Sequence, residues 1–146
     1  MNRQLTVLIV DAQGGGIGRQ LVAAARQELP QVKIIAVGTN AAATAAMLKA
    51  GADQGATGEN SVVVACRQAD VILGPIGIVI ADAMLGEITP RIAAAVAQSG
   101  AKRILIPFDH CDNIIAGVPE GSMKALVRQA VTILRQVAEN FPLTQG

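Results

Sequence analysis

The chain has 146 residues, a formal net charge of +1 and a hydrophobic content of 51%, with two Phe as its aromatic residues. A nucleic-acid binder needs a basic surface, and a single-strand binder also needs aromatic platforms, so we exclude nucleic acid as the partner. No apolar run approaches the roughly 18 residues of a membrane span. The first apolar run, 5–10, is too short for a signal-peptide core, so we expect a cytoplasmic protein.

Strand-like and helix-like segments alternate along the chain. In chain order the pattern predicts strand 5–10, helix 17–29, strand 33–37, helix 41–50, strand 54–57, helix 59–68, strand 70–73, helix 78–85, helix 90–99, strand 103–107, strand 113–118 and helix 121–138. Gly51 fits the end of the second helix, and Thr89 with Pro90 fits the start of the fifth. This alternation predicts one α/β domain over 1–146, a doubly wound, mostly parallel, Rossmann-like sheet between two helical layers.

A glycine-rich loop joins the first strand to the first helix. Without side chains its backbone can turn sharply, and its free N–H groups at a helix N-terminus favour an anion. We therefore expect a phosphate-bearing ligand here. The candidate binding residues in this loop are Asp11, Gln13, Gly14, Gly15, Gly16, Ile17 and Gly18. The alternative is that these glycines only allow tight packing of the helix on the strand.

Known glycine-loop patterns fit this loop to different degrees. The dinucleotide fingerprint G-x-G-x-x-G, aligned from Gly14, places Arg19 at its third glycine. Aligned on Gly16 and Gly18, the loop resembles the short-chain dehydrogenase form G-x-x-x-G-I-G, with Ala12 in the first position. The phosphate loop of NTPases does not fit, because its lysine and magnesium-binding hydroxyl are missing.

Two further segments are expected at the same edge of the sheet. Thr39 and Asn40 follow the second strand, where NAD enzymes place an acidic residue for the ribose hydroxyls; the uncharged pair permits either NADP or NAD. Asn40 also fits a helix cap. Gly74, Pro75 and Ile76 leave the fourth strand and are expected to wall the ligand site, or else to form only a rigid turn.

Residues with chemistry of their own are few. Residues 109–113 contain the one histidine, His110, which could act as an acid or base near neutral pH; a polar loop is the alternative. Cys66 lies on an apolar helix face and is expected to be a core thiol. Glu59 is expected to begin a helix, and the alternative is that it borders the ligand site. Asp82 and Glu87 lie in or near an apolar helix with no evident partner.

Four segments together, DAQGGGIG, VGTNAAATAAMLKAGADQGATGEN, ADVILGPIGIVIADAMLGEITP and ILIPFDHCDNIIAGV, resemble a family of short bacterial proteins classed as a domain of unknown function. The family loop begins Asp-Gly-Gln, whereas this chain has Asp11-Ala12-Gln13. The resemblance supports one Rossmann-like domain and implies no reaction.

Three functional hypotheses follow. The first is a protein that binds a nucleotide or dinucleotide, and the second is a regulatory or scaffold protein without a nucleotide. The third is a small enzyme that uses His110 on a phosphorylated or carboxylated metabolite. No metal site is expected. An exposed apolar segment expected over residues 76–85 favours a homodimer.

Overall fold

The computed structural model describes residues 4–108, 112–117 and 121–141. In this part of the chain five parallel strands form one sheet in the order β3-β2-β1-β4-β5. The strands are β1 (Thr6–Asp11), β2 (Lys33–Gly38), β3 (Gln54–Thr57), β4 (Val71–Pro75) and β5 (Lys102–Ile106). The helices are α1 (Gly16–Glu28), α2 (Ala41–Ala50), α3 (Glu59–Gln68), the 3₁₀ helix η1 (Ile76–Val79), α4 (Pro90–Gln98) and α5 (Met123–Glu139). The predicted α/β class is confirmed.

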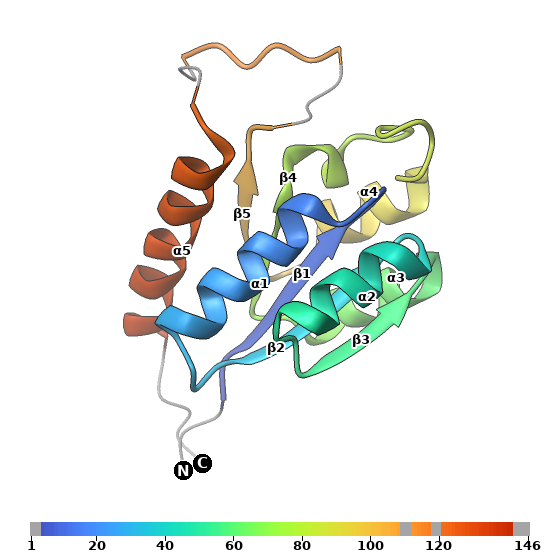
Figure 1. The fold of residues 1–146 in the computed structure, drawn as a ribbon. Coiled ribbons are helices and arrows are strands. Elements are labelled where there is room, and N and C mark those ends of the chain that lie inside the picture. The colour runs from blue at the N-terminus through green and yellow to red at the C-terminus, as the bar shows by residue number, and fades with distance from the viewer. Residues whose placement is uncertain (1–3, 109–111, 118–120, 142–146) are drawn as a thin grey trace.

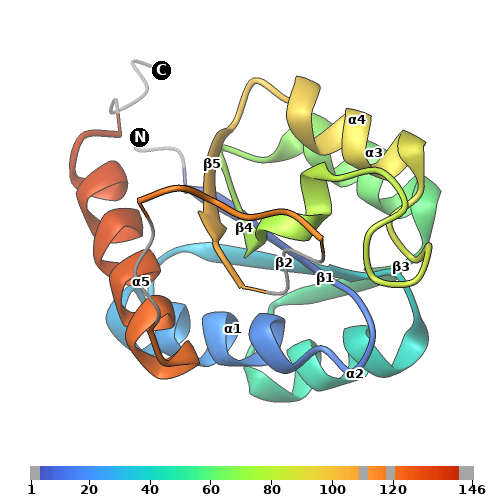
Figure 2. The ribbon, with the colours of Figure 1, turned by 90° about the horizontal axis from the view of Figure 1, so that it is seen from above.

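Helices cover both faces of the sheet, which gives three layers (Figures 1 and 2). On one face α1, α2 and α5 pack against inward side chains such as Val7 and Ile9 of β1. On the other face α3, η1 and α4 pack against the alternate residues, Leu8 and Val10. Since successive strand residues point to opposite faces, an unbroken aliphatic strand fills both layers of the core. Among the described helices, none is long and apolar enough to cross a membrane.

The strand order reverses between β1 and β4. From β1 the chain first adds β2 and β3 on one side, and it then returns to add β4 and β5 on the other. The two connections therefore diverge above the carboxyl ends of β1 and β4. In open parallel sheets ligands bind in the crevice at this point. Both the glycine-rich loop and the segment after β4 lie there.

The helix boundaries follow the predicted capping residues. The side chain of Asn40 accepts a hydrogen bond from Ala43 N at the start of α2, and Thr89 accepts one from Ile92 N at the start of α4. Pro90 takes the first helical position of α4. Gly51 ends α2 with a φ of 123°, a conformation that glycine adopts without strain.

The predicted helix 78–85 is wrong. After η1 the chain passes through turns, and Asp82, Met84 and Leu85 have φ values of 67°, 57° and 57°, which a right-handed helix does not allow. Ala83 and Met84 are buried in the same core cluster as the inward residues of α4, whereas Leu85 is 98% exposed. The apolar residues bury themselves through an irregular path, so the segment does not form the continuous exposed surface that favoured a homodimer.

The segments after β4 and after β5 also differ from the prediction. β4 extends through Gly74 and Pro75, which were expected in the turn. In the described part of the predicted strand 113–118, residues 113–117, there is no strand. This segment lies beyond the carboxyl ends of β4 and β5, away from the sheet (Figure 1), and Ile114 is 95% exposed. None of the five described strands pairs with this segment, so its aliphatic sequence does not make a strand.

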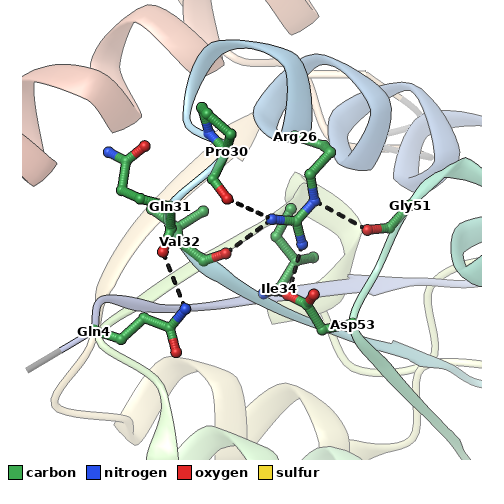
Figure 3. A network of polar contacts seen from close by, with 8 residues as sticks. All are labelled: Gln4, Arg26, Pro30, Gln31, Val32, Ile34, Gly51 and Asp53. Atoms are coloured by element: carbon green, nitrogen blue, oxygen red, sulfur yellow. Dashed lines mark hydrogen bonds and ion pairs between the residues drawn. The ribbon is translucent and has the colours of Figure 1, made fainter.

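Arg26 joins the α1–β2 and α2–β3 connections at the amino edge of the sheet (Figure 3). Its guanidinium donates to the carbonyl oxygens of Gly51, Pro30 and Val32 and to the Asp53 carboxylate. Asp53 Oδ2 also accepts a hydrogen bond of 2.8 Å from Ile34 N, so α1 is tied to the starts of both β2 and β3. The Ile34 N–H lowers the pKa of Asp53, and Arg26 adds to this against the opposing effect of burial.

Arg26→Met should lower the free energy of unfolding by about 1–3 kcal/mol, because it removes the donor of all four bonds while keeping the aliphatic stem. Urea denaturation measures this change. Arg19→Met is the matched control on the same helix, since Arg19 is exposed and its side chain makes no hydrogen bond among the described residues. Equal losses in both variants would contradict the assigned role of Arg26.

Asp53→Asn should change the pH dependence of stability. The folded pKa of Asp53 is lowered, so its contribution is present above the unfolded pKa of about 3.9 and is lost as the pH falls through the folded value. The stability difference between wild type and Asp53→Asn should therefore be largest near neutral pH and shrink below about pH 4. Urea denaturation at several pH values measures it, and a difference that does not change with pH would contradict this role.

Candidate functional site

The loop after β1 makes a tight turn that starts α1. Gly15 N donates to Ala12 O at 3.0 Å, and Gln13 and Gly15 adopt positive φ values of 51° and 73°. Gly16 and Ile17 are the first residues of α1, whose leading N–H groups have no partner within the helix. Among the described residues, no acceptor is found for the N–H groups of Gly14, Gly16 and Ile17. These three donors are the groups that could hold an anion.

The Asp11 carboxylate supports this loop from below. Its side chain lies at the end of β1 and is almost fully buried. Oδ1 accepts a hydrogen bond from Ala12 N at 2.8 Å, and Oδ2 accepts one from Gly18 N at 2.7 Å. Because α1 has no acidic residue in its first turn, Asp11 also places a negative charge near the positive end of the helix dipole. The geometry thus gives Asp11 a positioning role in the loop.

The four glycines of the loop divide into two pairs. A Cβ on Gly18 would lie 2.6 Å from Met47 Sδ and 2.9 Å from Asp11 Cβ, and a Cβ on Gly15 would lie 3.0 Å from the Ala43 backbone. These two glycines are required by packing. A Cβ on Gly14 or Gly16 would meet nothing within 4 Å. Packing therefore explains one pair, while the other leaves the backbone open to an incoming molecule.

Glu87 brings a second carboxylate to the loop, and the expectation that it lacks a partner is wrong. Its Oε1 accepts hydrogen bonds from Thr39 Oγ1 at 2.7 Å, Asn40 Nδ2 at 2.8 Å and Gln13 N at 2.9 Å. Burial alone would raise the pKa of Glu87, but these hydrogen bonds from Thr39, Gln13 and Asn40 outweigh it and keep the pKa below its ordinary value. Glu87 is therefore ionised at neutral pH and joins the glycine loop to the end of β2.

Glu87 is the site residue that the sequence analysis missed. Thr39 and Asn40 are brought beside the glycine loop as predicted, and Asn40 Nδ2 also donates to Gln13 O at 2.9 Å. The sequence around Glu87 could have indicated this role, because Glu87 is one of only two charged residues in the apolar stretch 71–88. A charge in such a stretch must be solvated or hydrogen-bonded.

The segment after β4 lies at the same edge of the sheet as the glycine-rich loop. β4 pairs with β1 in the register Ile9↔Leu73, so Gly74, Pro75 and Ile76 follow beside the end of β1. A Cβ on Gly74 would lie 2.5 Å from Val10 O, which explains this glycine by packing between the two strands. Pro75 is buried and Ile76 is half-buried at the start of η1. The segment is placed as expected for a wall of the site.

The remaining candidates are Cys66, Glu59 and residues 109–113. Cys66 is buried in α3 as expected, and burial raises the pKa of its thiol to about 11, so it is a core residue. Glu59 begins α3 as predicted and accepts a hydrogen bond from Thr89 Oγ1. Residues 109–111 of the polar cluster, including His110, lie outside the described residues, and Asp112 and Asn113 are exposed. In the described part of the chain no group of acidic, His and Cys side chains could hold a metal ion.

The two kinds of glycine should respond differently to substitution. Gly18→Ala should destabilise the fold by about 1–3 kcal/mol, because the rigid end of β1 at Asp11 cannot move away from the new methyl group. Gly16→Ala should change stability by less than about 1 kcal/mol, in either direction. Thermal unfolding of both variants measures the contrast, and similar losses would show that packing requires both positions.

Several solved structures are similar to this chain, and one family matches it. A dodecameric FMN-dependent Ubix-like decarboxylase from Escherichia coli O157:H7 is 19% identical over 96% of this chain and 99% of its own, with a TM-score of 0.47. A short-chain dehydrogenase/reductase from Serratia marcescens BCRC 10948 is 17% identical over 95% of this chain and 70% of its own, with a TM-score of 0.46. At these values the similarities bear on neither ligand nor reaction. Among curated proteins no sequence matches this chain.

The family match covers the whole described architecture. The family described as "Domain of unknown function (DUF3842)" matches residues 6–139. These bounds are the first residue of β1 and the last residue of α5, so the match includes every described strand and helix and the complete candidate site. The expected resemblance to a family without an assigned activity is confirmed, and the chain belongs to the DUF3842 family.

Proposed function

We propose that this protein binds a nucleotide or dinucleotide at the carboxyl edge of its sheet. The observation that carries the proposal is the set of three backbone donors at Gly14, Gly16 and Ile17, which have no acceptor among the described residues. They lie at the N-terminus of α1, where the helix dipole adds to their attraction for an anion. A phosphate group is an anion with enough acceptor oxygens to use all three.

The two open glycines support the same conclusion. Neither Gly14 nor Gly16 has a positive φ, and a Cβ at either position would meet nothing. Packing and backbone conformation therefore do not require glycine at these positions. A ligand would require it, because side chains there would prevent close approach to the donor groups.

The neighbouring elements give the proposed site its two sides. Thr39 and Asn40 lie at the end of β2 and would meet a ribose, whereas Gly74, Pro75 and Ile76 would cover the ligand beside β4. Both sides flank the reversal of strand order, which is the usual place for a ligand in such a sheet. The cofactor class would be NAD, NADP or another nucleotide.

One observation favours the second hypothesis, a regulatory or scaffold protein without a nucleotide. The carboxylates of Asp11 and Glu87 already accept from the N–H groups of Ala12, Gln13 and Gly18. These internal bonds satisfy part of the loop without any ligand, and two negative charges beside it weaken its attraction for an anion. Under this hypothesis the loop is a packing element. The homodimer stays a prediction from the sequence alone, since the exposed apolar surface that favoured it does not form.

A thermal-shift series tests the two functions. We expect NAD, NADP, FAD, FMN, ATP or GTP, each in large excess, to raise the melting temperature of the wild-type protein. A ligand at about 100 times its dissociation constant adds roughly 2.7 kcal/mol, which is about 9 °C for a chain of this size. If none of these nucleotides changes the melting temperature, the nucleotide proposal fails and the scaffold hypothesis stands.

Gly16→Leu should abolish the shift while leaving the melting temperature of the free protein nearly unchanged, because its side chain would extend into open space above the loop. Gly100→Leu is the matched control. Gly100 is also exposed with nothing near its Cβ, and it lies at the opposite edge of the sheet before β5. Ligand shifts that persist in Gly16→Leu would place the ligand elsewhere on the protein.

A further inference from the structure

We propose that Glu87 is a specificity-determining residue that makes the site select a nucleotide with a free ribose 2′-hydroxyl, such as NAD, over one with a 2′-phosphate, such as NADP. The inference rests on the proposed function and names the class of nucleotide. It replaces the sequence-based expectation that either cofactor is permitted by the uncharged pair Thr39 and Asn40.

The position of Glu87 is the first argument. NAD-binding sheets place a carboxylate at the end of the second strand, where it accepts from the ribose hydroxyls. Here the residue directly after β2 is Thr39, and the Glu87 carboxylate lies at its side chain, 2.7 Å from Thr39 Oγ1. The carboxylate that the end of β2 lacks is therefore supplied from the segment between η1 and α4.

The remaining hydrogen-bonding capacity of Glu87 is the second argument. Oε1 accepts all three bonds, from Gln13, Thr39 and Asn40, and no hydrogen bond to Oε2 occurs among the described residues. An ionised carboxylate can only accept, so Oε2 suits a hydroxyl donor. A ribose hydroxyl supplies such a donor, whereas a 2′-phosphate supplies only acceptors.

Charge is the third argument. Glu87 forms no ion pair in the described part of the chain, so no cation there offsets its negative charge. NADP sites place an arginine beside the 2′-phosphate. A 2′-phosphate next to Glu87 would instead meet a like charge at short range, which disfavours its binding.

The core holds Glu87 in place. Its neighbours Ala83, Met84 and Ile88 are buried, and Asp82 N donates to Ile88 O at 2.7 Å across the turn. Thr89, the residue after Ile88, then caps α4. A carboxylate with fixed neighbours on both sides is already oriented before a ligand arrives, which is the condition for strong discrimination.

Two ligand pairs isolate the 2′ position, with Kd values measured by isothermal titration calorimetry. The pairs are NAD with NADP, and AMP with adenosine 2′,5′-bisphosphate. We expect the wild-type protein to bind the member without the 2′-phosphate at least 10-fold more tightly in each pair. We also expect 2′-deoxy-AMP to bind at least 5-fold more weakly than AMP, and this comparison needs no variant.

Glu87→Gln keeps an oxygen for the three donors and replaces the other oxygen with an amide nitrogen. It should weaken NAD binding at least 10-fold without weakening NADP, so that the preference is lost. A merely structural role would weaken both ligands equally. Asp82→Asn is the matched control, since Asp82 is the exposed acid of the same turn and its side chain has no hydrogen bond among the described residues; it should leave the preference unchanged.

The outcomes separate the two proposals. Equal affinities of the wild-type protein within each pair, or equal weakening of both ligands by Glu87→Gln, would overturn the role of Glu87 and leave nucleotide binding standing. A further outcome is that the wild-type protein binds none of these five ligands but binds another nucleotide of the thermal-shift series. That result would also overturn the role of Glu87 alone. If the wild-type protein binds no nucleotide, both proposals are overturned.

Discussion

β1 lies at the centre of the sheet, hydrogen-bonded to β2 on one side and to β4 on the other, and its residues from Val7 to Val10 are completely buried. The chain can leave a strand enclosed in this way only at the carboxyl end, between the two helical layers. The loop that follows must therefore turn at once into α1. Its tight turn, its packing glycines and the position of its N–H groups at the strand-order reversal all follow from this constraint.

Two carboxylates organise the loop from opposite directions. Asp11 continues β1 and holds the loop from beneath, by accepting from the N–H groups on either side of the turn. Glu87 comes from the segment between η1 and α4 and links the loop to the residues after β2. The N–H groups that these acids do not use are those of the open glycines and Ile17. The same two interactions thus determine both the shape of the loop and its remaining capacity for a ligand.

The segment after η1 shows why an apolar pattern is not sufficient to predict a helix. Ile78, Ala83, Met84 and Ile88 are all buried, but three positive φ values at non-glycine residues intervene. Such conformations cost of order 1 kcal/mol each or more, and they persist only where surrounding structure determines them. Here the path of the chain is determined by the buried residues on both sides of the turn. The hydrogen bonds of Glu87 to Gln13, Thr39 and Asn40 determine it as well.

The sequence by itself determined the α/β class, most helix and strand boundaries, the capping residues Asn40 and Thr89, and the glycine loop, because strand runs, helical periodicity and caps are local properties. It did not determine which glycines serve packing, since Met47 and Ala43 come from another helix. It also did not reveal Glu87 as a site residue. Glu87 is 74 residues from Gln13 and 48 from Thr39, so only the parallel pairing of distant strands brings its carboxylate to the loop.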